Sequence, residues 1–136
     1  MIKSTYDSVG AFNYKKIKKE KLKMDIEFIR GDTQYIKFQL KDGSGNPIQL
    51  EDDEKIYFTL KQNSNSKKVL LQKKFPADIS FADGYYQLEL SSKDTSKLAY
   101  GSYQYDIELK INDFVKTLLM GTITLTEEIT FQGDEK

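Results

Sequence analysis

The side chains of this chain that could do chemistry are carboxylates, lysines, tyrosines and hydroxyls, because its 136 residues include no histidine and no cysteine. Without histidine, the commonest general base and transition-metal ligand is missing. Without cysteine, thiolate nucleophiles, zinc–thiolate sites and disulfides are excluded. Paired carboxylates can hydrolyse glycosides, but no pattern here brings two of them into one pocket. We therefore expect no enzymatic activity, no catalytic residue, no cofactor and no metal.

The acidic run Glu51–Glu54, with Asp42 upstream, is a candidate calcium site. An EF-hand loop that begins at Asp42 needs glycine at its sixth position and a bidentate glutamate at its twelfth. The sequence has Pro47 and Asp53 at these positions. The EF-hand hypothesis therefore fails. A solvated loop is expected, and another calcium geometry stays open as the alternative.

Arg30-Gly31-Asp32 is the tripeptide of integrin ligands. It lies between two expected strands, where glycine permits a tight turn and aspartate can cap it. We therefore expect Gly31 and Asp32 to serve the structure rather than recognition.

Tyr85 and Tyr86 are neighbours, so they face opposite sides of one expected strand. Tyr86 shares the face of Leu88 and Leu90 and is expected in the core, whereas Tyr85 is expected to point outward. An exposed tyrosine can stack on a sugar or anchor a protein interface. Tyr85 is therefore a candidate partner-binding residue, with a glycan as one possible partner.

Residues 1–23 form a lysine-rich arm with a net charge of +5, whereas residues 24–136 carry a net charge of −5. DNA, anionic lipid or an acidic protein surface could attract such an arm. Arg30 is the only arginine, which disfavours dedicated phosphate or base recognition. We expect the arm to dock on a neighbouring subunit and to favour a homo-oligomer. The arm residues expected to contact a partner are Tyr14, Lys15, Lys16, Ile17, Lys18, Lys19 and Leu22.

The elements that position these residues are predicted strands. Between Tyr103 and Ile111 apolar and polar residues alternate strictly, which is typical of a half-buried strand. Similar patterns predict strands over residues 24–28, 36–40, 56–60, 69–75, 86–90 and 114–129. Turn residues separate them, including Pro47, Gly84 and the pair Asn112-Asp113, and Gly121 is expected to mark a bulge or break in the last strand. Residues 91–98 predict one helical turn.

The segment Tyr100-Gly101-x-Tyr103 has the spacing of a tyrosine corner at the head of a late strand. Seven or eight short strands at regular spacing predict an all-β, immunoglobulin-like antiparallel β-sandwich. We expect an arm over residues 1–23, the sandwich over 24–130 and a tail over 131–136. No apolar run approaches the roughly 20 residues of a membrane helix. The amino terminus lacks a segment of signal-peptide length, so we expect the chain to stay in a cytosol or to leave without the general secretion route.

Five landmarks in this order resemble one family. They are Arg30-Gly-Asp-Thr33, Gly45-x-Pro47-x-x-Leu50, Asp83-Gly84-x-Tyr86-x-x-x-Leu90, Leu98-x-x-Gly101-x-Tyr103 and Gly121-x-Ile123-x-Leu125. Together they look like the amino-terminal immunoglobulin-like domain of phage baseplate upper proteins, from tailed phages of Gram-positive bacteria. The resemblance covers roughly residues 24–130.

The resemblance implies a structural role in a virion. The chain would join a tail or baseplate that assembles in the cytoplasm of the host bacterium, and its partners would be other tail proteins. A related phage-tail-like particle is an open variant of this expectation. The alternative from another class is a module that recognises a carbohydrate or a host surface.

Overall fold

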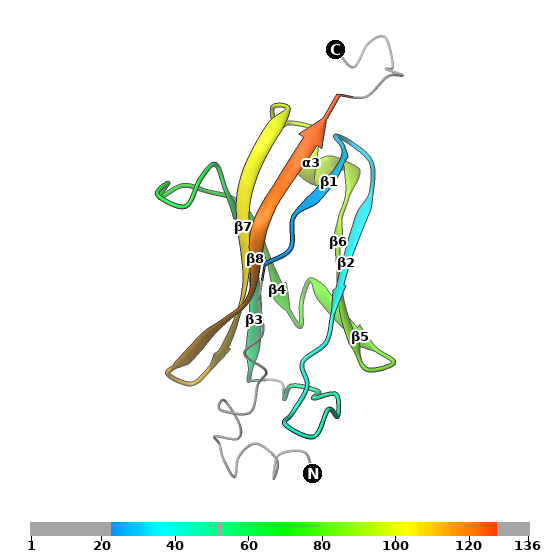
Figure 1. Cartoon of the computed structure of the whole chain (residues 1–136), viewed down its shortest axis with the longest axis vertical. Helices are drawn as coiled ribbons and strands as arrows, with labels where there is room; N and C mark the ends of the chain where they lie inside the picture. The colour runs from blue at the N-terminus through cyan, green and yellow to red at the C-terminus, as the bar shows by residue number, and fades with distance from the viewer. Residues whose placement is uncertain (1–22, 52, 128–136) are drawn as a thin grey trace.

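The computed structural model describes residues 23–51 and 53–127, which fold into two β-sheets packed face to face (Figure 1). The expectation of an all-β sandwich is confirmed. The described elements are β1 (Ile26–Ile29), β2 (Gln34–Phe38), β3 (Lys55–Lys61), β4 (Val69–Phe75), β5 (Ile79–Ala82), β6 (Tyr85–Leu90), α3 (Ser92–Thr95), β7 (Gly101–Ile111) and β8 (Phe114–Thr126). One sheet has the order β1-β8-β7-β3-β4 and the other β2-β6-β5.

The prediction of a purely antiparallel sandwich is wrong at one pair of strands. β1 runs parallel to β8, with Ile26 opposite Ile123. The physical reason is the connection: after β1 the chain turns at Arg30-Gly31 and crosses to the other sheet as β2, so no hairpin links the two partners. A parallel pair needs such a long crossover rather than a tight turn.

The core lies between the sheets and follows the alternation of the sequence. In β7 the side chains of Tyr103, Tyr105, Ile107 and Leu109 are buried, while Gln104 and Lys110 are exposed. β3 alternates in the same way beside β7 in the same sheet, and β6 in the other sheet supplies the facing layer. Burying one large apolar side chain stabilises a fold by about 1.5–3 kcal/mol, so these faces hold the two sheets together.

Three buried tyrosines also pin the backbone through their hydroxyl groups. Tyr86 donates a hydrogen bond to the carbonyl of Ile48 (2.8 Å) and accepts one from the amide of Leu50 (2.9 Å). Tyr103 donates to the carbonyl of Ala99 (2.7 Å), which is the bond that a tyrosine corner makes.

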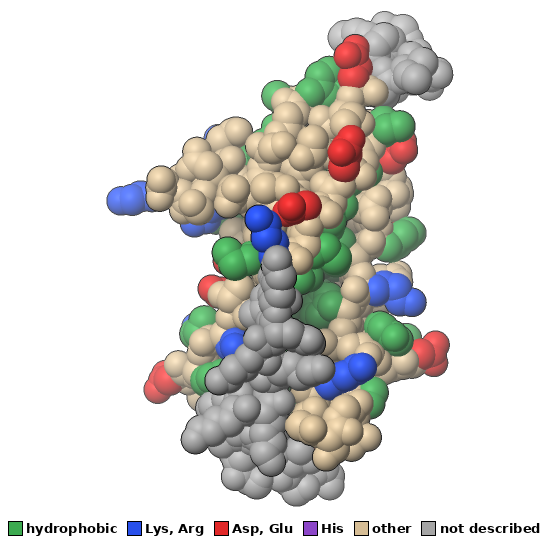
Figure 2. Space-filling model, in the orientation of Figure 1, with side chains coloured by type: hydrophobic (Ala, Val, Ile, Leu, Met, Phe, Trp, Pro, Cys, Tyr) green, Lys and Arg blue, Asp and Glu red, His purple; other side chains and the backbone are tan. Residues whose placement is uncertain are grey.

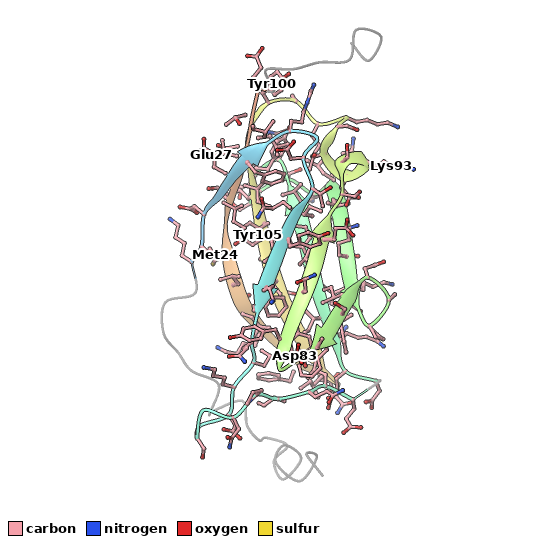
Figure 3. All side chains as sticks on the ribbon, turned by 90° about the vertical axis from the view of Figure 1, so that its right-hand side faces the viewer. Met24, Glu27, Asp83, Lys93, Tyr100 and Tyr105 are labelled. Atoms are coloured by element: carbon pink, nitrogen blue, oxygen red, sulfur yellow. The ribbon has the colours of Figure 1, made fainter. Side chains whose placement is uncertain are left out.

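Tyr105 donates to the carbonyl of Met24 (2.7 Å), so β7 holds the segment that leads into β1. The two residues lie beside each other at mid-height in Figure 3. Burial, with a smaller contribution from Asp25, raises the pKa of Tyr105 to about 12. The phenol therefore keeps its proton, and the hydrogen bond persists at neutral pH.

Pro47 and Gly84, which were both predicted in turns, lie close together at one end of the sandwich. The turn that follows Asp42 is closed by its carboxylate, which accepts hydrogen bonds from the amides of Ser44 (2.8 Å) and Asn46 (3.0 Å). Gly84, between β5 and β6, then lies close to Pro47: a Cβ atom at Gly84 would be 3.4 Å from the proline ring. The two turns therefore pack against each other.

The sequence predicted a bulge or break at Gly121, and the structure shows none at this position. Gly121 pairs in register with Tyr105. The irregularity in β8 lies at Leu118 instead: Ile107 pairs with Leu119 and Glu108 with Thr117, so Leu118 is the additional residue. Gly121 is required for another reason: a Cβ atom there would overlap the carbonyl oxygen of Met24 and lie 2.8 Å from its carbonyl carbon. β8 therefore needs glycine so that the backbone before β1 can approach.

Other boundaries shift by a few residues. β2 covers residues 34–38 rather than 36–40, although Leu40 is buried as expected. β5 was not predicted at all. β8 ends at Thr126, and residues 128 and 129 of the predicted strand lie outside the described residues. No helix in the described ranges is long and apolar enough to cross a membrane.

Candidate functional site

Two residues of the Arg30-Gly31-Asp32 tripeptide make contacts within the fold, and the amide of Asp32 donates to the carbonyl of Ile29 (3.0 Å). Gly31 adopts a φ of 89°, and its amide donates to the hydroxyl of the buried Thr95 in α3 (3.0 Å). The guanidinium of Arg30 lies 4.3 Å from the ring centroid of Tyr100 and donates to the carbonyl of Leu98 (3.2 Å). These contacts tie the turn to the segment before β7 and leave its arginine engaged within the domain.

The helical turn α3 sits at the same end of the molecule, where Figure 3 places Lys93 and Tyr100. Ser91 caps it by accepting from the amide of Asp94, whose carboxylate accepts in return from the amide of Ser91. Asp94 also pairs with the ammonium of Lys73 on β4 (2.9 Å). Burial raises the pKa of Asp94, but these hydrogen bonds and the lysine outweigh it, so the pKa lies below its usual value.

Tyr85 lies on the outer face of the three-stranded sheet, exposed as expected. The ammonium of Lys37 is 5.1 Å from its ring centroid. Tyr35 on β2 is also exposed but pairs with Glu89, four residues from Tyr85 and so roughly 13 Å away along the strand. The two rings therefore do not form a joint platform for a sugar.

A shallow groove marks the outer face of the five-stranded sheet. One hollow of about 290 Å³ is lined by Lys23, Gln104, Met120, Gly121 and Thr122. A second hollow of about 120 Å³ shares Gln104 and Met120 with the first, so the two lie next to each other. Its other lining residues are Thr59, Lys61, Ser64, Tyr105 and Asp106. Most lining residues come from β3, β7 and β8, while Lys23 precedes β1 and Ser64 lies in the loop after β3. Their polar side chains can hydrogen-bond a polar partner.

Carboxylates and lysines share this face. Burial raises the pKa of Asp106, the nearby Glu108 raises it further, and Lys61 opposes the shift. Asp25, at the edge beside β8, accepts a hydrogen bond from the amide of Thr122 (3.0 Å). Acidic and basic side chains are also interspersed on the side of the molecule that Figure 2 shows, which presents this sheet from its edge rather than from its outer face. The face suits a polar protein surface of mixed charge.

The acidic run does not gather into a metal site within the part of the chain that the structure describes. Glu54 is buried, and its carboxylate accepts from the amide of Glu51 (2.7 Å), which closes a local turn. Asp52 lies outside the described residues. Elsewhere in residues 23–51 and 53–127, no three acidic side chains come together closely enough to hold an ion.

The expected partner-binding residues of the arm, Tyr14, Lys15, Lys16, Ile17, Lys18, Lys19 and Leu22, lie outside the described residues. The structure places the root of the arm: the backbone of Lys23 pairs with Met120 in a parallel bridge, and the amide of Met24 donates to the carbonyl of Met120 (2.8 Å). The arm therefore joins the body at the rim of the groove. Sequence reasoning did not find this groove, because its lining is contributed by strands far apart in the chain.

By sequence, no family model and no curated protein matches the chain. Among solved structures, it is similar to the endo-β-1,4-mannanase of Thermotoga petrophila, with a TM-score of 0.47 and 15% identity over 90% of this chain and 23% of the other. A family 123 glycoside hydrolase from Clostridium perfringens gives a TM-score of 0.43 and 14% identity over 94% and 25%. The chain thus spans about a quarter of the length of both. At these TM-scores we draw no conclusion from either likeness.

Proposed function

We propose that this chain is a non-enzymatic structural component of a phage tail or baseplate, or of a phage-tail-like particle, that assembles in the bacterial cytoplasm. The virion role rests on the five ordered landmarks between Arg30 and Leu125. The sandwich acts as a rigid spacer, and the basic arm and the sheet edges dock on neighbouring subunits.

The finer architecture that we propose is immunoglobulin-like. The strand order supports it: β8-β7-β3-β4 faces β2-β6-β5, as strands G-F-C-C′ face B-E-D in variable-type domains. The hydrogen bond from Tyr103 to Ala99, before the start of β7, supports it as well.

The observation that carries the docking role is the position of the arm's root. Lys23 pairs with Met120 on the rim of the groove, and Asp106 lines the same groove. A basic segment therefore leaves the body beside the carboxylate of Asp106, in a groove that Lys61 also lines, and every copy of the chain presents both the segment and the groove. Such complementary charges favour association between copies and with similar acidic neighbours.

The test is the solution mass by light scattering, for the full chain and for a chain that begins at Met24. We expect the full chain to be an oligomer and the shorter chain a monomer. A full-length variant with Lys15→Glu, Lys16→Glu, Lys18→Glu and Lys19→Glu controls for effects of truncation and is also expected to be monomeric. An unchanged mass in all three would contradict docking through the arm. Saturable glycan binding that Tyr85→Ala abolishes would favour the recognition module instead.

A further inference from the structure

Met120 is the more exposed of the two methionines in the part of the chain that the structure describes. Its side chain is 51% exposed, and it lines both hollows of the groove. Asp106, which pairs with Met120, lines the groove as well, so the thioether lies on the outer face of the five-stranded sheet. The sulfur of Met120 is therefore open to small molecules in the solvent.

The other described methionine has different surroundings. Met24 is half-buried and packs against the core, and its carbonyl accepts the hydrogen bond from Tyr105. Met1, the third methionine of the chain, lies outside the described residues. Met24 thus provides a comparison for Met120 within the same molecule.

The composition of the chain directs oxidation to its methionines. Cysteine and methionine carry the side-chain sulfur atoms that peroxide oxidises, and this chain has three methionines and no cysteine. Tryptophan and histidine, which stronger oxidants attack, are also absent. Within residues 23–51 and 53–127, a peroxide therefore meets one thioether on the surface.

The groove places hydrogen-bond donors around this thioether. The ammonium of Lys23, the amide of Gln104 and the hydroxyl of Thr122 line the same hollow as Met120. Each can donate a hydrogen bond to the peroxide oxygen that departs, and then to the oxygen that stays on the sulfur. A methionine in an apolar core would have no such donors, so the groove favours both the reaction and its product.

We propose that Met120 is an oxidation site of this protein, with hydrogen peroxide as the oxidant and methionine sulfoxide as the product. A lone pair of the sulfur attacks one peroxide oxygen, and the bond between the two oxygens breaks. The attacked oxygen stays on the sulfur, and its proton passes to the departing oxygen, which leaves as water. The sulfur thereby loses the two electrons that the peroxide gains. This inference goes beyond the proposed function and does not depend on it.

The sulfoxide would change the groove beside the root of the arm. Oxidation turns an apolar side chain into a polar one. The hydrogen bond from the amide of Met24 to the carbonyl of Met120 (2.8 Å) involves only backbone atoms, so it is retained. We therefore expect the fold to persist while the surface of the groove becomes more polar.

The test is treatment of the full chain with dilute hydrogen peroxide, followed by trypsin digestion and mass spectrometry. Trypsin cleaves after Lys23, Arg30 and Lys116, so the two methionines fall on separate peptides. We expect Met120 of the folded chain to gain one oxygen atom about tenfold faster than Met24, and the two rates to converge in urea. Equal rates in the folded chain, or faster oxidation of Met24, would overturn the proposal.

Two variants and one enzyme complete the design. Met120→Leu keeps an apolar side chain without sulfur, and the fast phase of oxidation should disappear. Met24→Leu is the matched control and should leave the rate at Met120 unchanged. Methionine sulfoxide reductase should restore the original mass of the Met120 peptide, because the sulfoxide is reducible. A fast phase that survives in Met120→Leu, or a mass that the reductase does not restore, would show that the product is not a sulfoxide at Met120.

Discussion

Tyr86→Phe removes one oxygen atom from the core and keeps the ring. That oxygen donates to the carbonyl of Ile48 at 2.8 Å and accepts from the amide of Leu50 at 2.9 Å. All three residues are buried, so the two backbone groups would be left without partners away from water. A buried group that loses its partner costs about 1–3 kcal/mol. We therefore expect the free energy of unfolding to fall by about 2–4 kcal/mol, out of a typical total of about 5–15 kcal/mol.

The assay is urea unfolding followed by circular dichroism. The midpoint should fall with an unchanged slope, and the melting temperature by about 10 °C or more. Tyr35→Phe is the matched control: Tyr35 is 52% exposed, so it should change stability by less than about 0.5 kcal/mol. The Leu50 amide should also exchange faster in the Tyr86 variant. If Tyr86→Phe is as stable as the control, the hydroxyl does not hold the segment before β3, and the reasoning is refuted.

Three further changes test other contacts. Gly121→Ala forces a methyl group onto the Met24 carbonyl, so stability should fall by about 1–3 kcal/mol in thermal unfolding, and an unchanged melting temperature would argue against this close approach. The raised pKa of Asp106 means that its ionisation costs stability above its ordinary pKa, so Asp106→Asn should be more stable at neutral pH, and the gain should vanish in acid. The lowered pKa of Asp94 has the opposite sign: its stabilisation is full above the ordinary pKa and is lost as the pH falls through the folded value. Asp94→Asn should therefore be less stable than the natural chain at neutral pH and approach its stability in acid. Urea unfolding midpoints at neutral and at acidic pH check the predictions for Asp94 and Asp106. A difference in midpoint that does not change with pH would contradict the predicted sign for either carboxylate.

The strands with one buried face were predictable from the sequence. Val69–Phe75 was predicted with its observed bounds. In β7 the alternation of apolar and polar residues correctly predicted which side chains are buried. A local pattern suffices there because each side chain reports whether its own face is buried. β5 was missed because Ile79-Ser-Phe-Ala82 offers only two alternations, and its pairing depends on β6.

Contacts between distant residues were beyond local reasoning. The sequence marks Gly121 as unusual but cannot distinguish a bulge from the approach of Met24, which is 97 residues earlier in the chain. The groove is similar, since Lys61, Gln104 and Met120 meet only once three strands are paired. The ion pair between Lys73 and Asp94 likewise joins separate elements and leaves no local signal.

The parallel pairing of β1 with β8 has a mechanical consequence. The chain enters β1 at one end of the pair and leaves β8 at the other, so a load between residues 23 and 127 pulls the two strands past each other. Four paired positions then bear the load together, whereas an antiparallel hairpin pulled at its open ends separates one bond at a time. Single-molecule pulling at residues 23 and 127 should therefore need a higher rupture force than pulling at residues 101 and 126, the open end of the β7–β8 hairpin, and equal forces would contradict this geometry. Resistance to tension would thus come from one short edge strand, while thermodynamic stability comes from the core.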